Sequence, residues 1–184
     1  MNDPAMDGLV EGLDRELARD PRGGQVAALL EAYAGAAADW RPYALFDPRT
    51  YARNLVRACE VYELLVICWQ AGQASPIHDH QGQRCWMAVL EGTIQETLYR
   101  EAAGRGPLIQ GPVRAYGRGS VAFITDDMGL HEIRPAGGPA VSLHLYSRPI
   151  RECRIFDRDS GEVTERALVY HSVAGVRQRE SAPA

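Results

Sequence analysis

The stretch that decides the fold is GQASPIHDHQGQRCWMAVLEG, residues 72–92. It holds a His-x-His pair, His78 and His80, which an apolar run follows and Gly72 and Gly92 frame. Residues i and i+2 of a β-strand point to the same face, so both imidazoles can aim at one metal ion inside a β-structure. Imidazole suits zinc, copper, iron and nickel, so the pair alone does not choose the metal.

A third histidine lies downstream, in Asp127-Met128-Gly129-Leu130-His131. A His-x-His pair by itself is equally explained by buried histidines that hydrogen bonds satisfy. The framing glycines together with His131 favour metal binding over that interpretation.

Short apolar runs separated by Gly, Pro and Asp turns fill the chain from residue 62 onward. Short strands at regular spacing indicate a sandwich or barrel, and Leu90-Glu91-Gly92-Thr93 predicts a hairpin turn between two of them. We therefore predict a mainly β fold, an antiparallel β-barrel. The predicted strands are Leu64–Trp69, Cys85–Leu90, Thr93–Tyr99, Ser120–Thr125, Ala140–Tyr146 and Val163–Tyr170.

The chain up to about residue 56 has a helical pattern instead. Apolar residues recur at three- to four-residue spacing in two groups, with a break at residues 21–24 between them. The first group is Val10, Leu13 and Leu17, and the second is Val26, Leu29, Leu30 and Tyr33. Asp47 followed by Pro48 predicts the N-cap and first turn of a third helix, which would carry Tyr51, Arg53 and Asn54.

These patterns predict one domain with three parts. Residues 1–60 form a helical region packed on the barrel, residues 61–172 form the barrel, and residues 173–184 form a polar tail. A chain of 184 residues is long enough to bury a sizeable core.

The bulk composition excludes several classes of function. A net charge of −4 gives no electrostatic footprint for nucleic acid. No apolar stretch approaches the roughly 20 residues that span a membrane, and the N-terminus has no secretory signal pattern. The four cysteines show no C-x-x-C pairing, which favours free thiols and a cytoplasmic location.

The histidine stretch resembles the cupin superfamily, whose first motif has the form G-x5-H-x-H-x3,4-E-x6-G. This chain matches every fixed position except the glutamate, which Cys85 replaces. The second cupin motif is partly present in Gly119, Gly129 and His131, while its proline and terminal asparagine are missing. The resemblance implies a cupin-type jelly roll with His131 as the third metal ligand.

The missing glutamate has a chemical consequence. Three neutral imidazoles leave the metal its full charge and several open positions, which favours an anionic ligand such as a substrate thiolate. An Fe(II) site with open positions can activate oxygen. Alternatively, Cys85 itself ligates the metal, in which case a soft thiolate favours zinc or copper.

A narrower resemblance covers roughly residues 51–157 and is to the cysteine dioxygenases. The matching segments are Tyr51–Val56, Ile67–Trp69, Ile77–His80, Cys85, Glu96–Leu98, Gly129–His131, Val141–Ser147, Cys153 and Phe156–Asp157. The resemblance implies Fe(II) on the three histidines and oxidation of cysteine by O2 to cysteine sulfinate. It also implies that Arg53 binds the substrate carboxylate, which a guanidinium fork matches, and that Tyr51 flanks that contact.

The same resemblance gives roles to one further strand. Ser142, His144 and Tyr146 would form a hydrogen-bonded relay ending at the Tyr146 hydroxyl, and their alternation puts all three on one strand face. For His144 the alternative is a structural hydrogen bond to Ser142. Cys85 and Tyr146 match the pair that forms a thioether crosslink in the eukaryotic enzymes, although a buried strand cysteine is more often inert.

The chain departs from the family after the relay. Eukaryotic members read Tyr-Ser-Pro-Pro, with a cis bond before the first proline. This chain reads Tyr146-Ser147-Arg148-Pro149, so Arg148 stands in place of that proline. A cis bond before Arg148 is strongly disfavoured, so we expect a different pocket corner and a second positive charge near the substrate. Related enzymes that oxidise 3-mercaptopropionate carry glutamine in place of Arg53. Arg53 therefore favours cysteine, while Arg148 keeps 3-mercaptopropionate or another small thiol open.

Two other functions stay open. A non-catalytic cupin would bind a metal or small ligand as a sensor, but no basic helix-turn-helix accompanies it near the N-terminus. A zinc-dependent isomerase would differ in its metal. We expect a monomer whose partners are a small thiol and O2, with no nucleic acid and no membrane. Trp69 is expected in a pocket wall or the core, Cys59, Cys68 and Cys153 are expected to be structural, and His171 has no assigned role.

Overall fold

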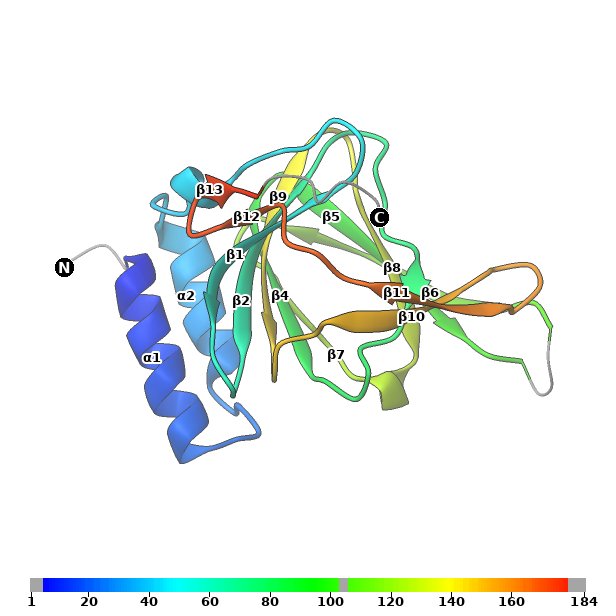
Figure 1. The fold of residues 1–184 in the computed structure, drawn as a ribbon, viewed down its shortest axis with the longest axis horizontal. Coiled ribbons are helices and arrows are strands. Elements are labelled where there is room, and N and C mark those ends of the chain that lie inside the picture. The colour runs from blue at the N-terminus through cyan, green and yellow to red at the C-terminus, as the bar shows by residue number, and fades with distance from the viewer. Residues whose placement is uncertain (1–4, 103–105, 179–184) are drawn as a thin grey trace.

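The computed structural model describes residues 5–102 and 106–178 and shows two helices beside two facing β-sheets (Figure 1). The helical elements are α1 (Met6–Arg19), α2 (Val26–Ala36) and the short 3-10 turns η1 (Arg41–Tyr43) and η2 (Asp126–Met128). The strands are β1 (Ala52–Ala58), β2 (Glu63–Trp69), β3 (Ile77–His78), β4 (Cys85–Glu91), β5 (Thr93–Arg100), β6 (Ile109–Gly117), β7 (Val121–Ile124), β8 (Leu130–Pro135), β9 (Ala140–Tyr146), β10 (Glu152–Phe156), β11 (Val163–Ala167), β12 (Ser172–Val173) and β13 (Val176–Arg177).

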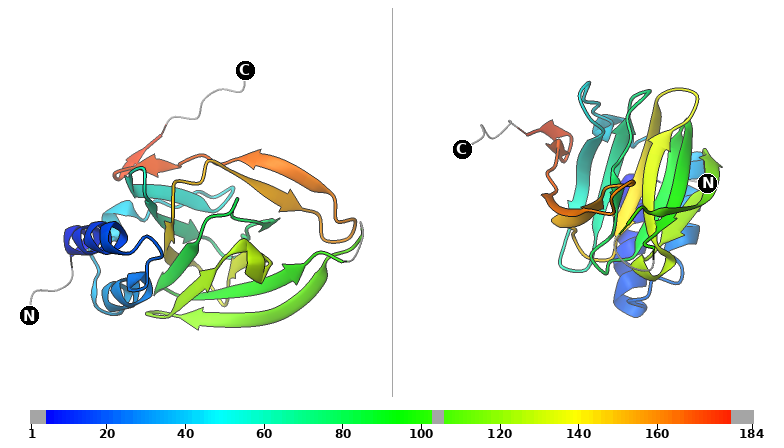
Figure 2. Two further views of the ribbon diagram at one scale, coloured as in Figure 1. Left: turned by 90° about the horizontal axis from the view of Figure 1, so that it is seen from below. Right: turned by 90° about the vertical axis from the view of Figure 1, so that its right-hand side faces the viewer.

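The two sheets have seven and six strands. Their orders are β13-β12-β1-β2-β9-β4-β7 and β11-β10-β3-β8-β5-β6. The sheets face each other as a jelly roll and are not joined by hydrogen bonds into one closed barrel (Figure 2). This confirms the predicted mainly β, jelly-roll class with an N-terminal helical part.

Strands β2 and β9 are buried on both faces, which explains their continuous apolar runs. Leu64 and Leu143 pack outward against the helices, whereas Leu65 and Tyr146 face the space between the sheets. Alternation along β9 therefore sends Ser142, His144 and Tyr146 to the interior, as the sequence predicted. Neither described helix has the length and hydrophobicity that crossing a bilayer requires.

The predicted third helix is wrong, because the segment after Asp47 and Pro48 forms strand β1. The Asp47 carboxylate accepts a hydrogen bond from the Arg49 backbone N–H at 2.8 Å, which makes a turn. Residues 52–55 are buried, and β1 pairs antiparallel with β2 and parallel with β12. The two flanking strands override the local helix-start signal, so Arg53 and Asn54 lie on a strand.

The β-structure therefore starts at Ala52, before the predicted boundary at residue 61, because β1 belongs to the seven-stranded sheet. It also continues past residue 172, since β12 and β13 form a small hairpin at the edge of that sheet. The rest of the predicted tail, residues 179–184, lies outside the described residues, as do residues 1–4 of the predicted helical region.

Candidate metal centre

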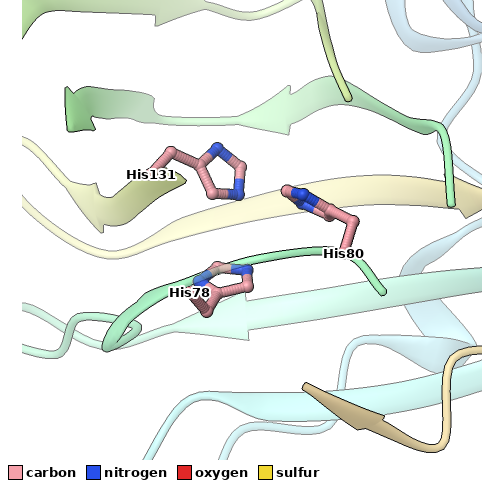
Figure 3. A group of neighbouring side chains, drawn as sticks. All are labelled: His78, His80 and His131. Carbon is pink, nitrogen blue, oxygen red and sulfur yellow. The ribbon is translucent and has the colours of Figure 1, made fainter. Parts of the chain in front are cut away.

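Three histidines converge between the sheets (Figure 3). His78 ends β3 and lies directly opposite His131 of β8, while His80 follows two residues later. One ligand atom from each of the three lies within 4.8 Å of the others, and the ring centroids are 4.7 to 5.2 Å apart. The structure thus brings the His-x-His pair and the distant third histidine together in one cluster.

The surroundings of the rings suit a metal. The His78 Nδ1–H donates to the Pro76 carbonyl at 2.9 Å, and the His131 Nδ1–H donates to Glu96 at 2.8 Å, which leaves each Nε2 lone pair free. Burial lowers the pKa of His78 to about 4 and that of His131 well below its usual range, so both imidazoles are neutral ligands. Both ring nitrogens of His80 are buried without a hydrogen-bond partner, although Asp126 Oδ1 lies 3.5 Å from Nδ1; a metal ion would satisfy one of the two nitrogens.

Two carboxylates hold the histidines from behind. Glu96 of β5 is buried, accepts the hydrogen bond from His131, and is itself bound by the Tyr116 hydroxyl at 3.1 Å. Asp126 accepts the backbone N–H groups of His80 and Gly82, each at 2.7 Å. Burial raises the pKa of Asp126, but the neighbouring His80 side chain and the hydrogen bonds from the two backbone N–H groups outweigh burial and lower the pKa to about 2. Such carboxylate partners fix ring orientation and raise ligand basicity.

Sequence reasoning missed both carboxylates. Glu96 belongs to a segment that resembles the cysteine dioxygenases, but that resemblance assigned it no role. No motif pointed to Asp126, which is only close in sequence to His131. Asp79, between the two ligands, points away from the site and binds the Arg154 backbone N–H and Nε at 2.9 and 2.6 Å. This contact ties the loop to β10.

Cys85 is not part of the histidine cluster in the described chain. Its Sγ lies 3.9 Å from His144 Nδ1 and faces Tyr146 across the β4–β9 pair. Burial raises the pKa of the Cys85 thiol, which disfavours a thiolate. The alternative of a Cys85-ligated zinc or copper site is therefore not supported by the geometry.

A cavity opens beside the histidines. Its wall includes Tyr51, Arg53, His78, His131, His144 and Tyr146, so most of the predicted site residues meet there. The cavity volume is ≈ 30 Å³, counted as the space that the centres of water-sized molecules can occupy. One water needs about 10–15 Å³ by the same measure, so the cavity suits a small ligand. Among the described residues its wall has two arginines, Arg53 and Arg166, and no Asp or Glu.

Arg53 is buried, and only one of its two terminal guanidinium nitrogens has a hydrogen-bond partner. Its Nη2 donates to the Glu63 carboxylate at 2.9 Å, whereas its Nη1 is buried without a hydrogen-bond partner. Leaving a charged donor unpaired in the interior is costly, so an anionic group is expected to complete it. Arg148, by contrast, is exposed and does not line the cavity. The second positive charge at the cavity is that of Arg166, which the sequence did not single out.

The aromatic wall connects to the predicted relay. Tyr51 stacks on Trp69 with ring centroids 4.7 Å apart, and the Trp69 Nε1–H donates to Ser142 Oγ at 2.9 Å. Ser142 Oγ in turn lies 2.9 Å from His144 Nε2. Trp69 thus holds the start of the relay as well as the cavity wall.

The last link of the relay is absent from the described structure, in which no hydrogen bond joins His144 to Tyr146. Their rings are stacked with centroids 6.2 Å apart. Burial first, and then the charge of Cys85, raise the pKa of the Tyr146 hydroxyl well above its usual value. Tyr146 therefore stays protonated and can donate a hydrogen bond into the cavity.

His144 is expected to make the metal-free protein sensitive to acid. Burial, followed by the charge of Arg53, lowers its pKa from 6.5 to about 3. The unfolded chain takes up this proton first, so the stability from His144 is complete above about pH 6.5 and is lost as the pH falls towards 3. Between about pH 7 and pH 5 the loss amounts to about 2 kcal/mol.

Urea unfolding of the metal-free protein at the two pH values measures this loss. In His144→Gln the free energy of unfolding should fall by about 2 kcal/mol less than in the wild type. Equal losses in both proteins would show that His144 is not the acid-sensitive group.

The remaining sequence expectations are partly resolved. All four cysteines are free; Cys59 and Cys68 lie in or against the core, but Cys153 lines the cavity. His171 lies outside the metal cluster, 3.5 Å from the Asp47 carboxylate.

Comparison with known proteins gives one family. The sequence model described as cysteine dioxygenase type I matches residues 17–159. Cysteine dioxygenase type 1 of Rattus norvegicus is 37% identical over 157 residues, which covers 83% of this chain and 78% of that protein. The Homo sapiens protein is 35% identical with the same coverage, and the Danio rerio protein is 35% identical over 161 residues, 83% of this chain and 79% of that one. A protein of Klebsiella pneumoniae with a double-stranded β-helix domain superposes with a TM-score of 0.49 at 14% identity, covering 72% of this chain and 97% of that one.

Proposed function

Because the chain belongs to the cysteine dioxygenase type I family, we propose that it is an Fe(II)-dependent dioxygenase that converts L-cysteine and O2 to cysteine sulfinate. The observation that carries this proposal is the unpartnered Nη1 of Arg53, in the wall of the cavity that His78 and His131 also line. A small molecule with a carboxylate at one end and a thiol at the other can satisfy both groups at once.

His78, His80 and His131 would hold the iron. When bound, Fe(II) supplies open positions for a thiolate and O2 and the electrons that activate O2. Both atoms of O2 enter the sulfur group, so oxidation of the thiol to the sulfinate uses up the oxidant and needs no external reductant. Because no reducing cosubstrate has to bind, a small cavity suffices.

The other residues position the substrate. Arg53 would pair with the carboxylate through Nη1, in a charge-assisted hydrogen bond. Tyr51, held by Trp69, would flank that contact, and the Tyr146 hydroxyl would donate to the reacting groups. Ser142 and His144 would keep this wall in place from the β9 side, because their hydrogen bond is buried.

Cys85 and Tyr146 are proposed to form a thioether crosslink. They lie directly opposite each other in the β4–β9 pair, where side chains are neighbours. The bond would join the Cys85 Sγ to a ring carbon of Tyr146 with loss of two hydrogen atoms, and O2 is the oxidant. We expect the aerobic iron-loaded protein to show a faster-migrating band on a denaturing gel, which Cys85→Ser eliminates.

Cys153→Ser is the matched control, because it removes the thiol that lines the cavity, leaves Cys85 in place and should keep the faster band. A wild-type protein that gives one band at the position of Cys85→Ser after turnover has no crosslink.

A second substrate, 3-mercaptopropionate, is favoured by one feature of the cavity. Its wall has no acidic side chain among the described residues that would select the ammonium group of cysteine. Oxygen uptake by the iron-loaded protein with the two thiols in parallel distinguishes them. Sulfinate formed mainly from cysteine supports the proposal, preference for 3-mercaptopropionate changes the substrate but keeps the reaction, and no uptake with either favours a non-catalytic cupin.

We propose the cytoplasm as the cellular setting. All four cysteines are unpaired, which fits the reducing cytoplasm. Every group proposed for binding or catalysis comes from this one chain, so we expect the monomer to be active.

A further inference from the structure

The segment after β11 crosses the strand that carries Arg53. The backbone N–H of His171 donates to the Arg53 carbonyl at 2.8 Å, and β12 then pairs with β1. The Ser172 hydroxyl donates to Asn54 at 2.7 Å. Leu168 of the same segment lines the cavity. The segment lies beyond residue 159, where the match to the family model ends.

Tyr170 is the residue of this segment that reaches the Arg53 side chain. The Arg53 guanidinium carbon lies over the Tyr170 ring, 5.5 Å from its centroid. The Tyr170 hydroxyl donates to Glu63 Oε2 and accepts a hydrogen bond from Arg151 Nη1. Burial, and next the hydrogen bond to Glu63, raise the pKa of Tyr170 to about 12, so the hydroxyl keeps its proton.

Glu63 is the link between Tyr170 and Arg53. Its carboxylate is fully buried, and Oε1 accepts Arg53 Nη2 at 2.9 Å and the Ile150 backbone N–H at 3.3 Å. Tyr170 binds the second oxygen, Oε2, so both ends of the carboxylate are fixed. An arginine side chain has several rotatable bonds and loses entropy when it is ordered. This carboxylate and the Tyr170 ring together hold the guanidinium in one orientation, with Nη2 on Glu63 and Nη1 left over.

We propose that Tyr170 is a positioning residue that, through Glu63, aims Arg53 Nη1 at the carboxylate of the substrate. It thereby sets the preference of the cavity for thiols that carry a carboxylate. This inference rests on the proposed function for the role of Arg53, and it adds a determinant of substrate preference from outside the matched region of the family.

The test is Tyr170→Phe, which keeps the ring on Arg53 and removes only the hydroxyl. The measured quantity is the equilibrium affinity of the anaerobic iron-loaded protein for L-cysteine and for 2-aminoethanethiol, which lacks the carboxylate. We expect the Kd for cysteine to rise about tenfold, the size of one lost hydrogen bond to a charged group, with that for 2-aminoethanethiol unchanged. In steady-state turnover of Tyr170→Phe, KM for cysteine should rise and kcat should stay unchanged.

Tyr33→Phe is the matched control. The Tyr33 hydroxyl also donates to a carboxylate, Asp39 Oδ1 at 2.7 Å, but in the helical part of the chain. This variant should keep the wild-type Kd for both thiols.

Three results would overturn the inference: an unchanged Kd for cysteine in Tyr170→Phe, an equal loss for both thiols, or a wild type that binds both thiols equally well. Failure of the proposed function would be seen in a different measurement. A wild-type protein that binds cysteine but consumes no oxygen would contradict the proposed reaction, and the Kd values would still test the role of Tyr170.

Discussion

Replacing His131 with alanine is expected to remove both the metal and the activity. Two imidazoles would remain, and the buried Glu96 would lose the ring N–H that it accepts at 2.8 Å. Losing a hydrogen-bond partner of a metal ligand already costs about 10–100-fold in metal affinity or activity, and loss of the ligand itself must exceed that. Metal analysis after gel filtration and oxygen uptake with cysteine measure the two effects.

His171→Ala provides the control for this experiment. His171 lies outside the histidine cluster, and its ring faces Asp47 and Arg177. The control should retain iron as the wild type does. Full iron occupancy in His131→Ala would remove His131 from the ligand set and with it the proposed centre.

Replacing Arg53 with methionine is expected to raise KM for cysteine by about 30-fold or more. Methionine keeps the apolar part of the side chain and removes the guanidinium charge, and a buried charged contact is worth about 2–5 kcal/mol. Steady-state oxygen uptake over a range of cysteine concentrations measures the change. An unchanged KM would exclude Arg53 from substrate binding.

Loss of Arg53 also removes the nearer of two cations beside the buried Glu63, since Arg151 Nη1 stays 3.9 Å from Oε2. Breaking a buried ion pair destabilises a protein by about 3–5 kcal/mol. The double variant Arg53→Met/Glu63→Gln removes both charges and separates the two effects. It should recover most of the stability and still bind cysteine weakly. Arg148→Gln is the matched control, since this arginine is exposed outside the cavity and should leave KM unchanged.

The arrangement of charge explains how this site differs from the four-ligand cupin pattern. The position of the usual glutamate ligand holds Cys85, which faces Tyr146 and not the metal cluster. The carboxylate that accepts a ring N–H from the histidine cluster is instead Glu96, behind His131. A carboxylate one step removed can raise ligand basicity without occupying a coordination position, which leaves positions open for substrate and O2.

The parts of the fold that were predictable are those with a local signal. The strands β2, β4, β5 and β9 are apolar runs bounded by turn residues, and the two long helices have regular spacing. β1 was mistaken for a helix because its strand character depends on β2 and β12, which lie elsewhere in the chain. β6 was missed because nearly all of its residues are exposed and it contains Gly111 and Pro112, so it lacks an apolar pattern.

The same distinction applies to the site. Several residues of the cavity wall, such as His78 and His144, could be named from motifs, because histidine spacing and strand alternation are local, whereas Arg166 belongs to no such motif. Groups that hold them, such as Glu96 and Tyr170, act across large separations in sequence: the hydroxyl of Tyr170 reaches a carboxylate 107 residues away. Such contacts depend on which strands become neighbours, which no local pattern specifies.

The most direct test of the central claim is the fate of the oxygen atoms. The iron-loaded protein should be incubated with cysteine under ¹⁸O₂ and the product examined by mass spectrometry. The proposed function predicts cysteine sulfinate in which both sulfinate oxygens carry the label. Label in only one oxygen, or a product without label, would contradict dioxygenation at this site.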